Sequence, residues 1–169
     1  MNTGKSLSNT AIISINEGRK IGSIKDLYLN ADAREVIAVL VGKEGLLGRK
    51  PQIVERSQLA VIGVDVWLAR ESDAVKSLND VPGGEDYLAM ADFRGREIVT
   101  SGGTKIGSIG DVLLDDEARV RGFMLGRVHV QGTLADSKRV ARDAITDLGD
   151  DENPVILDMA LAEMLQLPE

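Results

Sequence analysis

Few side chains in this sequence have the chemistry or the spacing that catalysis needs. His129 is the only histidine, and a lone histidine lacks the partners of a catalytic triad or a metal site. Ser23 and Ser108 occupy equivalent places, but a nucleophilic serine needs a nearby base, so we interpret both as strand or bulge residues. The absence of cysteine removes disulfides, thiolate metal sites and cysteine nucleophiles. We therefore expect a protein that is not an enzyme.

Two further patterns resemble ligand-binding motifs without meeting their requirements. The glycine-rich run 102–107 resembles a phosphate loop, but such loops precede a helix, and the residues that follow here have the pattern of a strand. We expect a hairpin turn with a bulge instead. The acidic groups at 115–117, 147 and 150–152 lack the spacing of an EF-hand loop, so we interpret them as solvated turns. No cofactor and no metal site is expected.

Charge and apolar patterning exclude further classes of protein. The 169 residues carry a formal net charge of −7, with residues 1–80 at +1 and residues 81–169 at −8. Nucleic-acid binders need a positive surface, so we expect no direct nucleic-acid partner, although the first half has room for a local basic patch. The longest apolar run, residues 36–41, is far shorter than the roughly 20 residues of a membrane helix. With no secretory core after Met1, we expect a cytoplasmic protein without a membrane span.

The elements that must position these side chains occur twice. Gly18–Leu27 recurs as Gly103–Val112, an offset of about 85 residues, and the match continues into the apolar runs 36–42 and 120–126. A match of this length with so few gaps indicates duplication, and each copy is long enough for a core of its own.

The boundary between the copies falls in a stretch with the composition of a linker. Residues 79–86 combine Asn, Asp, Pro and paired glycines, which are typical of turns and linkers. We predict a first module at 1–80, a linker at 81–91 and a second module at 92–169.

Each copy has the pattern of a small barrel of short strands. Strands are expected at 12–15, 21–29, 36–41, 52–54 and 64–67 in the first copy, and at 155–157 near the end of the second. Gly22 and Gly107 break strict alternation, as a bulge or bend at a barrel corner requires. Asp26 and Asp111 should accept backbone hydrogen bonds beside those bends. Because residues 36–41 are apolar throughout, one face should fill the barrel and the other should meet something else.

A short α-helix is predicted after each barrel. Residues 74–78 follow a Ser-Asp pair that could cap them, and residues 159–165 follow Asp158. The side chains of the second helix expected to dock on a barrel are Leu161, Met164 and Leu165. The predicted fold class is all-β with short helices, in two tandem small β-barrels that are each followed by a short α-helix.

The shared pattern resembles the PRC-barrel family. A turn glycine precedes Ile-Gly-Ser-Ile-Lys-Asp at 21–26, then come a polar turn and an apolar strand ending in glycine, and Gly-Leu-Leu-Gly-Arg-Lys follows at 45–50. The resemblance covers nearly all of the first copy and about residues 93–126 of the second. The family includes the photosynthetic reaction-centre H subunit and the C-terminal domain of the ribosome maturation factor RimM. Two barrels in one chain imply a tandem, stand-alone prokaryotic member.

The loop at 45–50 is the most suggestive place for contact with a partner. Its two leucines could tuck back over the barrel end, or they could form an apolar and basic contact patch on a largely acidic protein. Trp67, the only tryptophan, could cover the barrel floor or anchor an interface. The candidate partner-contact residues are Lys43, Leu46, Leu47, Arg49, Lys50 and Trp67.

Together these patterns favour a binding protein. The leading hypothesis is a non-catalytic protein–protein interaction or assembly module with an unknown protein partner. One alternative is an accessory factor in ribosome maturation or RNA processing that acts through a ribosomal protein, and another is a small-ligand binder that uses a cleft between the barrels. Because residues 36–41 cannot bury both faces in one small barrel, we also predict a two-fold homodimer.

Overall fold

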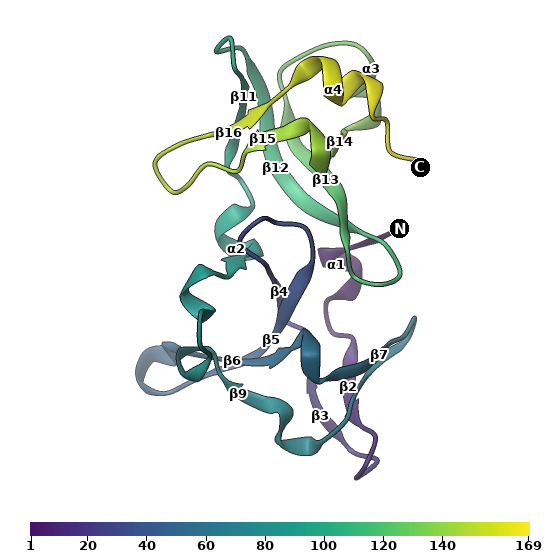
Figure 1. Cartoon of the computed structure of the whole chain (residues 1–169), viewed down its shortest axis with the longest axis vertical. Helices are drawn as coiled ribbons and strands as arrows, with labels where there is room; N and C mark the ends of the chain where they lie inside the picture. The colour runs from purple at the N-terminus through teal and green to yellow at the C-terminus, as the bar shows by residue number, and fades with distance from the viewer.

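The computed structural model describes residues 1–169, apart from the side chain of Leu46. The chain forms two small β-barrels that lie end to end along the long axis of the molecule (Figure 1). The first barrel is built from β2–β9 and the second from β11–β16. The predicted fold class, all-β with short helices in two tandem barrels, is confirmed. No described helix is both long and apolar enough to cross a membrane.

The elements follow one another in a similar order in the two copies. The first copy contains β1 (Asn2–Thr3), α1 (Gly4–Leu7), β2 (Ala11–Ser14), β3 (Lys20–Ser23), β4 (Asp26–Leu29), β5 (Val36–Glu44), β6 (Lys50–Glu55), β7 (Leu59–Ile62), β8 (Val66–Ala69) and β9 (Val75–Ser77). The second contains β10 (Leu88–Ala89), α2 (Met90–Phe93), β11 (Glu97–Thr100), β12 (Lys105–Leu114), β13 (Val120–Val128), α3 (Thr133–Ser137), β14 (Arg139–Ala141), β15 (Ile145–Asp147), β16 (Val155–Leu157) and α4 (Met159–Met164).

The strand pairing is the same in the two copies except at one bend and at β9, which pairs with β6 in the first copy and has no counterpart among the described residues of the second. β2 pairs antiparallel with β3 and parallel with β8, as β11 does with β12 and β16. In the first copy the corresponding long strand is interrupted between β3 and β4. The strands therefore form two sheets, ordered β3-β2-β8-β7 and β10-β4-β5-β6-β9. In the second copy β12 runs unbroken and joins the strands into one sheet ordered β14-β13-β12-β11-β16-β15.

The predicted bulges lie beside Gly22 and Gly107. The β2–β3 register shifts immediately after the pair Ile12–Gly22, and the β11–β12 register shifts after the equivalent pair Ile98–Gly107. A methyl group on Gly107 would overlap the carbonyl oxygen of Arg127 on β13. The bend therefore needs glycine there because another strand's backbone passes too close for a side chain.

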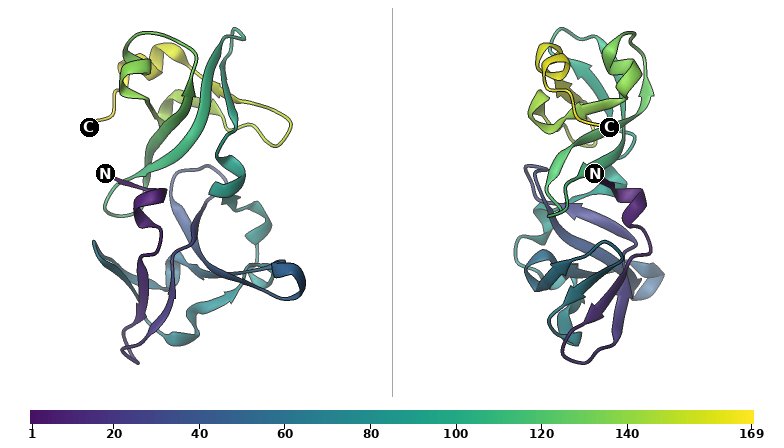
Figure 2. Two further views of the ribbon diagram at one scale, coloured as in Figure 1. Left: turned by 180° about the vertical axis from the view of Figure 1, so that it is seen from behind. Right: turned by 90° about the vertical axis from the view of Figure 1, so that its right-hand side faces the viewer.

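The two copies exchange their first strands. β1 pairs with β12 of the second copy, with Asn2 opposite Leu114, and β10 pairs with β4 of the first copy, with Leu88 opposite Leu29. The N-terminus consequently lies between the two lobes (Figure 2). Each barrel thus receives an edge strand from the other copy, and the predicted linker 81–91 contains one of these strands.

The turns before β5 and β13 meet where the two lobes join. The Val36 amide donates to the Ala118 carbonyl, and the Val120 amide donates to the Arg34 carbonyl. This reciprocal pair indicates an approximate two-fold relation between the copies. We call the region formed by these turns and the exchanged strands the seam.

The main apolar core runs through both barrels and the seam. It includes Ile12 and Trp67 in the first copy and Ile98 in the second, all fully buried. Phe93 of α2 packs edge-on against Phe123 of β13, with ring centroids 5.1 Å apart, in the favourable aromatic geometry. The short helices after the exchanged strands therefore complete the core between the lobes.

The outer face of β5 is covered by the same chain. Val36 and Val39 face the main core, whereas Ala38 packs in a second cluster with Tyr28, Ile53 and Val81. We expected the outer face of this strand to contact something other than its own barrel interior. The segment 78–89 covers that face and contributes further apolar side chains to this cluster. This burial removes the reason for which we predicted a homodimer.

Two details of the predicted helices are wrong. Residues 75–77 form the strand β9 on the edge of β6 rather than a helix at 74–78, because ladder hydrogen bonds are available there and a helix of five residues is marginal alone. The short helix after the first barrel is α2. At α4, Asp158 caps the helix as predicted by accepting from the Leu161 amide at 3.1 Å, but Met164 is 71% exposed, and Ala162 is buried in its place.

Candidate functional site

The hairpin between β5 and β6 carries most of the predicted contact residues. The hairpin projects from the side of the first barrel (Figures 1 and 2). Its tip is held by three residues with positive φ: Gly45 at 83°, Leu47 at 61° and Gly48 at 62°. The Gly48 amide donates to the Gly45 carbonyl at 3.1 Å. The tip is therefore a tight turn in which one non-glycine residue adopts the left-handed conformation.

The side chains at this tip are exposed. Leu47 is 78% exposed, and Lys43, Arg49 and Lys50 are exposed around it. The side chain of Leu46 lies outside the described residues. The tip thus places an apolar side chain among three cations, with Glu44 as the neighbouring anion.

Trp67 is not a contact residue. Its side chain is fully buried in the core, where β8 places it opposite Ile12 of β2. A partner cannot reach it without opening the barrel. The interpretation that Trp67 covers the barrel interior is correct, and its assignment as a candidate partner contact is wrong.

A polar cluster bridges the copies at the seam. Asp26 and Asp111 each accept the backbone amide of the next residue at 2.9 Å, as predicted from their place beside the bends. Arg94, which follows α2, lies between them. Its Nη1 is 3.0 Å from both carboxylate oxygens of Asp26, and its Nη2 is 3.3 Å from Oδ1 of Asp111. The Lys5 amide also donates to Asp111 at 2.8 Å. The cluster therefore ties equivalent carboxylates of the two copies to one guanidinium.

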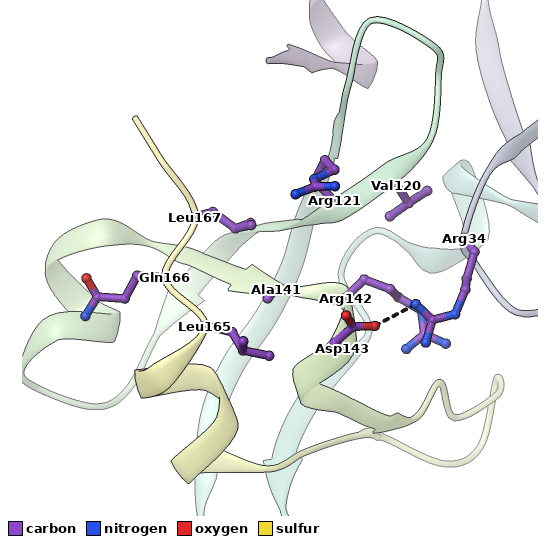
Figure 3. Close-up of a pocket in the computed structure, with 9 residues that line it drawn as sticks. All are labelled: Arg34, Val120, Arg121, Ala141, Arg142, Asp143, Leu165, Gln166 and Leu167. Carbon is purple, nitrogen blue, oxygen red and sulfur yellow. Dashed lines mark hydrogen bonds and ion pairs between the residues drawn. The ribbon is translucent and has the colours of Figure 1, made fainter.

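A second polar site lies at the seam beside the turn before β5. A pocket of about 290 Å³ is bounded by the turn before β5, by β13 and β14, and by the C-terminal residues after α4 (Figure 3). Its lining residues combine cations with apolar side chains: Arg34, Val120, Arg121, Ala141, Arg142, Asp143, Leu165, Gln166 and Leu167. We call it the arginine pocket.

The buried member of the arginine pocket is Arg142, which is only 9% exposed. Its Nε and Nη2 donate to the Asp32 carbonyl at 2.9 and 2.7 Å, and its Nη1 donates to the Ile145 carbonyl at 3.0 Å. Burial lowers the pKa of the Arg142 guanidinium, and the nearby Arg34 cation lowers it further. Arg142 therefore links the two copies through hydrogen bonds to neutral carbonyl groups. Its positive charge is largely shielded from solvent.

The carboxylate in the pocket is held by another arginine. Arg34 Nη1 lies 2.6 Å from Oδ1 of Asp143, and both side chains are more than half exposed. The hydrogen bond from Arg34 lowers the pKa of the Asp143 carboxyl, as does the charge of the same guanidinium. Asp143 is thus ionised and engaged at neutral pH.

The remaining candidates from the sequence stay apart from these sites. His129 is exposed just beyond β13, and Ser108 lies within β12, where its hydroxyl accepts from the Arg127 amide at 3.1 Å. The run 102–107 forms the predicted hairpin turn before and at the start of β12. Among the described residues, no group of three or more His, Cys, Asp or Glu side chains could hold a metal ion.

The sequence interpretation did not anticipate Arg94 and Arg142. The signal for Arg142 is its recurrence, because Val54-Glu55-Arg56 and Val140-Ala141-Arg142 occupy the same place in the two copies. Arg94 gives no such signal, since its counterpart after α1 is Ser8.

Comparison with known families agrees with this geometry. The model of the PRC-barrel domain matches twice, at residues 1–75 and 85–146. The two matches cover most of the chain, so this protein belongs to the PRC-barrel family. A search of curated proteins finds no match.

Proposed function

We propose that this protein is a non-catalytic interaction or assembly module whose protein partner contacts the β5–β6 hairpin tip. The observation that carries this proposal is Leu47, which is 78% exposed and held in the left-handed conformation. That conformation costs a non-glycine residue about 1–2 kcal/mol. Four other non-glycine residues also have positive φ, namely Asn9, Ala33, Ala118 and Lys138. Leu47 differs from them because it presents a large apolar side chain to solvent.

Burial of Leu47 against a partner supplies a driving force for association. A leucine side chain gains roughly 1.5–3 kcal/mol when it moves from water into an apolar environment. The hydrogen bond from the Gly48 amide to the Gly45 carbonyl closes the turn, and a turn that is already closed loses less conformational freedom on binding. Leu47 can therefore serve as the apolar contact of the hairpin tip.

The charges around Leu47 define the chemistry of the partner. The tip carries three cations and one anion, namely Lys43, Arg49, Lys50 and Glu44. It is therefore positively charged on a protein whose net charge is −7. Complementary charges steer association and select partners. The expected partner therefore presents an apolar pocket with an acidic rim.

Photo-crosslinking in the native host tests this proposal. Benzoylphenylalanine would replace Leu47 in one variant and Val64, which is 96% exposed on another loop, in a matched control. We expect one discrete adduct from position 47 that is absent from position 64 and that excess unlabelled protein competes away. Excess Leu47→Asp protein should not compete. A ribosomal protein in the adduct would favour the ribosome-maturation alternative.

Two outcomes would contradict the proposal. Equal labelling from positions 47 and 64 would mean that exposure alone explains the adducts. Competition by Leu47→Asp protein, with an unchanged circular dichroism spectrum, would mean that the leucine does not contribute.

The homodimer is a separate prediction, and the buried face of β5 no longer supports it. The covered outer face of β5 leaves isolated apolar side chains for self-contact, including Ile15, Val61 and Met164. Light scattering distinguishes a monomer of 18.1 kDa from a dimer. The Leu47→Asp variant shows whether a dimer uses the hairpin tip.

A further inference from the structure

We propose that the arginine pocket binds the phosphate group of a small molecule, a role separate from partner binding at the hairpin tip. The pocket lies at the seam, about 290 Å³ in volume, which is the lower end of the size range for small-ligand sites. Figure 3 shows the guanidinium groups of Arg34 and Arg142 close together, with Leu165 and Leu167 on another wall.

The first argument is the buried cation. Arg142 is 9% exposed, and its three hydrogen-bond contacts are to carbonyl oxygens of Asp32 and Ile145. Among the described residues, no carboxylate lies within ion-pair distance of it, and the charges of Asp143 and Asp32 act on it only from a greater distance. Buried charges are normally paired with an opposite charge. An anion in the pocket would provide that charge.

The second argument is the charge of the whole lining. Three arginines face one aspartate. Arg121, on β13, has no ion-pair partner among the described residues and leaves its guanidinium free for a ligand. The lining therefore carries a net charge of +2 where the first module meets the strongly acidic second module.

The third argument is the contrast with the equivalent place in the first copy. There Arg56 replaces Arg142, and the neighbouring pocket is lined by Glu35, Glu117 and Arg119 as well as Arg56. Two carboxylates neutralise two arginines, and Ile37 takes the place of Arg121 on the paired strand. The excess of positive charge thus comes from side chains that differ between the two pockets and not from the barrel fold.

The charge and the shape favour a phosphate monoester over a carboxylate. A phosphate monoester carries about −1.5 to −2 charges at pH 7, which matches the lining, whereas a carboxylate carries one. Guanidinium groups bind phosphate oxygens through paired hydrogen bonds. Val120, Leu165 and Leu167 offer an apolar wall to the organic part of the ligand.

Calorimetric titration of the full chain tests the inference with phenyl phosphate, benzoate and inorganic phosphate. Phenyl phosphate and benzoate share an aromatic ring and differ in the charge of the anion. We expect phenyl phosphate to bind saturably and at least about tenfold more tightly than benzoate, with inorganic phosphate weaker than phenyl phosphate. Equal affinity for benzoate, or no saturation at millimolar phenyl phosphate, would overturn the inference.

Matched variants assign the binding to the pocket. Arg121→Gln removes an exposed cation without touching the hydrogen bonds of Arg142 and should weaken phenyl phosphate binding about tenfold. Asp143→Asn removes the competing anion and should strengthen it. Arg119→Gln, in the neutral counterpart pocket, should leave it unchanged. Equal losses in Arg119→Gln and Arg121→Gln would show general charge attraction and contradict the assignment.

Discussion

The two copies share their strands, core and seam but differ at the tips of their longest hairpins. Between β5 and β6 the chain turns tightly and leaves Leu47 78% exposed. Between β13 and β14 it forms α3 and buries Leu134 to 3% exposure. The tips lie outside the barrel cores, so one barrel framework accommodates both. The first tip therefore presents an apolar side chain to solvent, whereas the second tip packs its leucine into the core.

The copies also differ at the residues that complete the seam. Arg142 makes three hydrogen-bond contacts below 3.1 Å, including two across the seam, whereas its counterpart Arg56 makes one contact, at 3.4 Å with the Leu59 carbonyl of its own copy. The approximate two-fold relation is therefore a property of the backbone. The side chains at the seam differ between the two copies.

The largest expected difference between the copies is at the bulge glycines. Gly107→Ala should destabilise the protein by about 3 kcal/mol, because its methyl group would overlap the Arg127 carbonyl. Gly22→Ala should cost about 1 kcal/mol, since the nearest atom is the Val41 Cβ at 3.1 Å, which can shift. Urea unfolding measures both. Equal losses would mean that the two bends are equally tight.

The hairpin tips give the next largest difference. Leu134→Ala should destabilise the protein by about 2 kcal/mol, because it removes a buried leucine at the edge of the core. Leu47→Ala should change the free energy of unfolding by less than about 0.5 kcal/mol. The same urea titrations apply, and a large loss in Leu47→Ala would place that side chain in the core and contradict its role at an exposed tip.

A smaller effect is expected at the polar cluster of the seam. Arg94→Gln removes the cation between Asp26 and Asp111 and should cost about 1 kcal/mol, since all three side chains are partly exposed. Ser8→Ala, at the equivalent place after α1, should be neutral. Thermal unfolding at low and high salt adds a control, because the loss in Arg94→Gln should shrink as salt screens the carboxylates. A salt-independent loss would indicate packing instead.

The smallest effect is a pH dependence that comes from Asp143, a carboxyl group with no counterpart at the equivalent place in the first copy. The folded-state pKa of Asp143 is lowered by Arg34, so the stability it contributes is present above its ordinary pKa near 3.8 and is lost as the pH falls through the lowered value. Asp143→Asn should therefore be slightly less stable than the wild type at pH 6, and the difference should shrink below about pH 4. Ser57→Ala, at the equivalent place, should show no such trend, and a constant difference for Asp143→Asn would contradict the linkage.

The sequence by itself determined the architecture of each copy. Recurrence of Gly18–Leu27 as Gly103–Val112 predicted the duplication, and broken alternation at Gly22 and Gly107 predicted the bulges. Asp158 predicted the start of α4. These features depend on contacts between neighbours along the chain or on the two-residue period of a strand, so their signals are local.

Only the tertiary structure decided how the copies use one another. The exchange of β1 and β10, the covering of β5 by residues 78–89 and the burial of Trp67 all depend on which distant segment lies beside each strand. Periodicity shows that a face is apolar but not what covers it. Likewise, the contact of Arg142 with Asp32 joins residues 110 positions apart, and such pairs form only when the barrels meet at the seam.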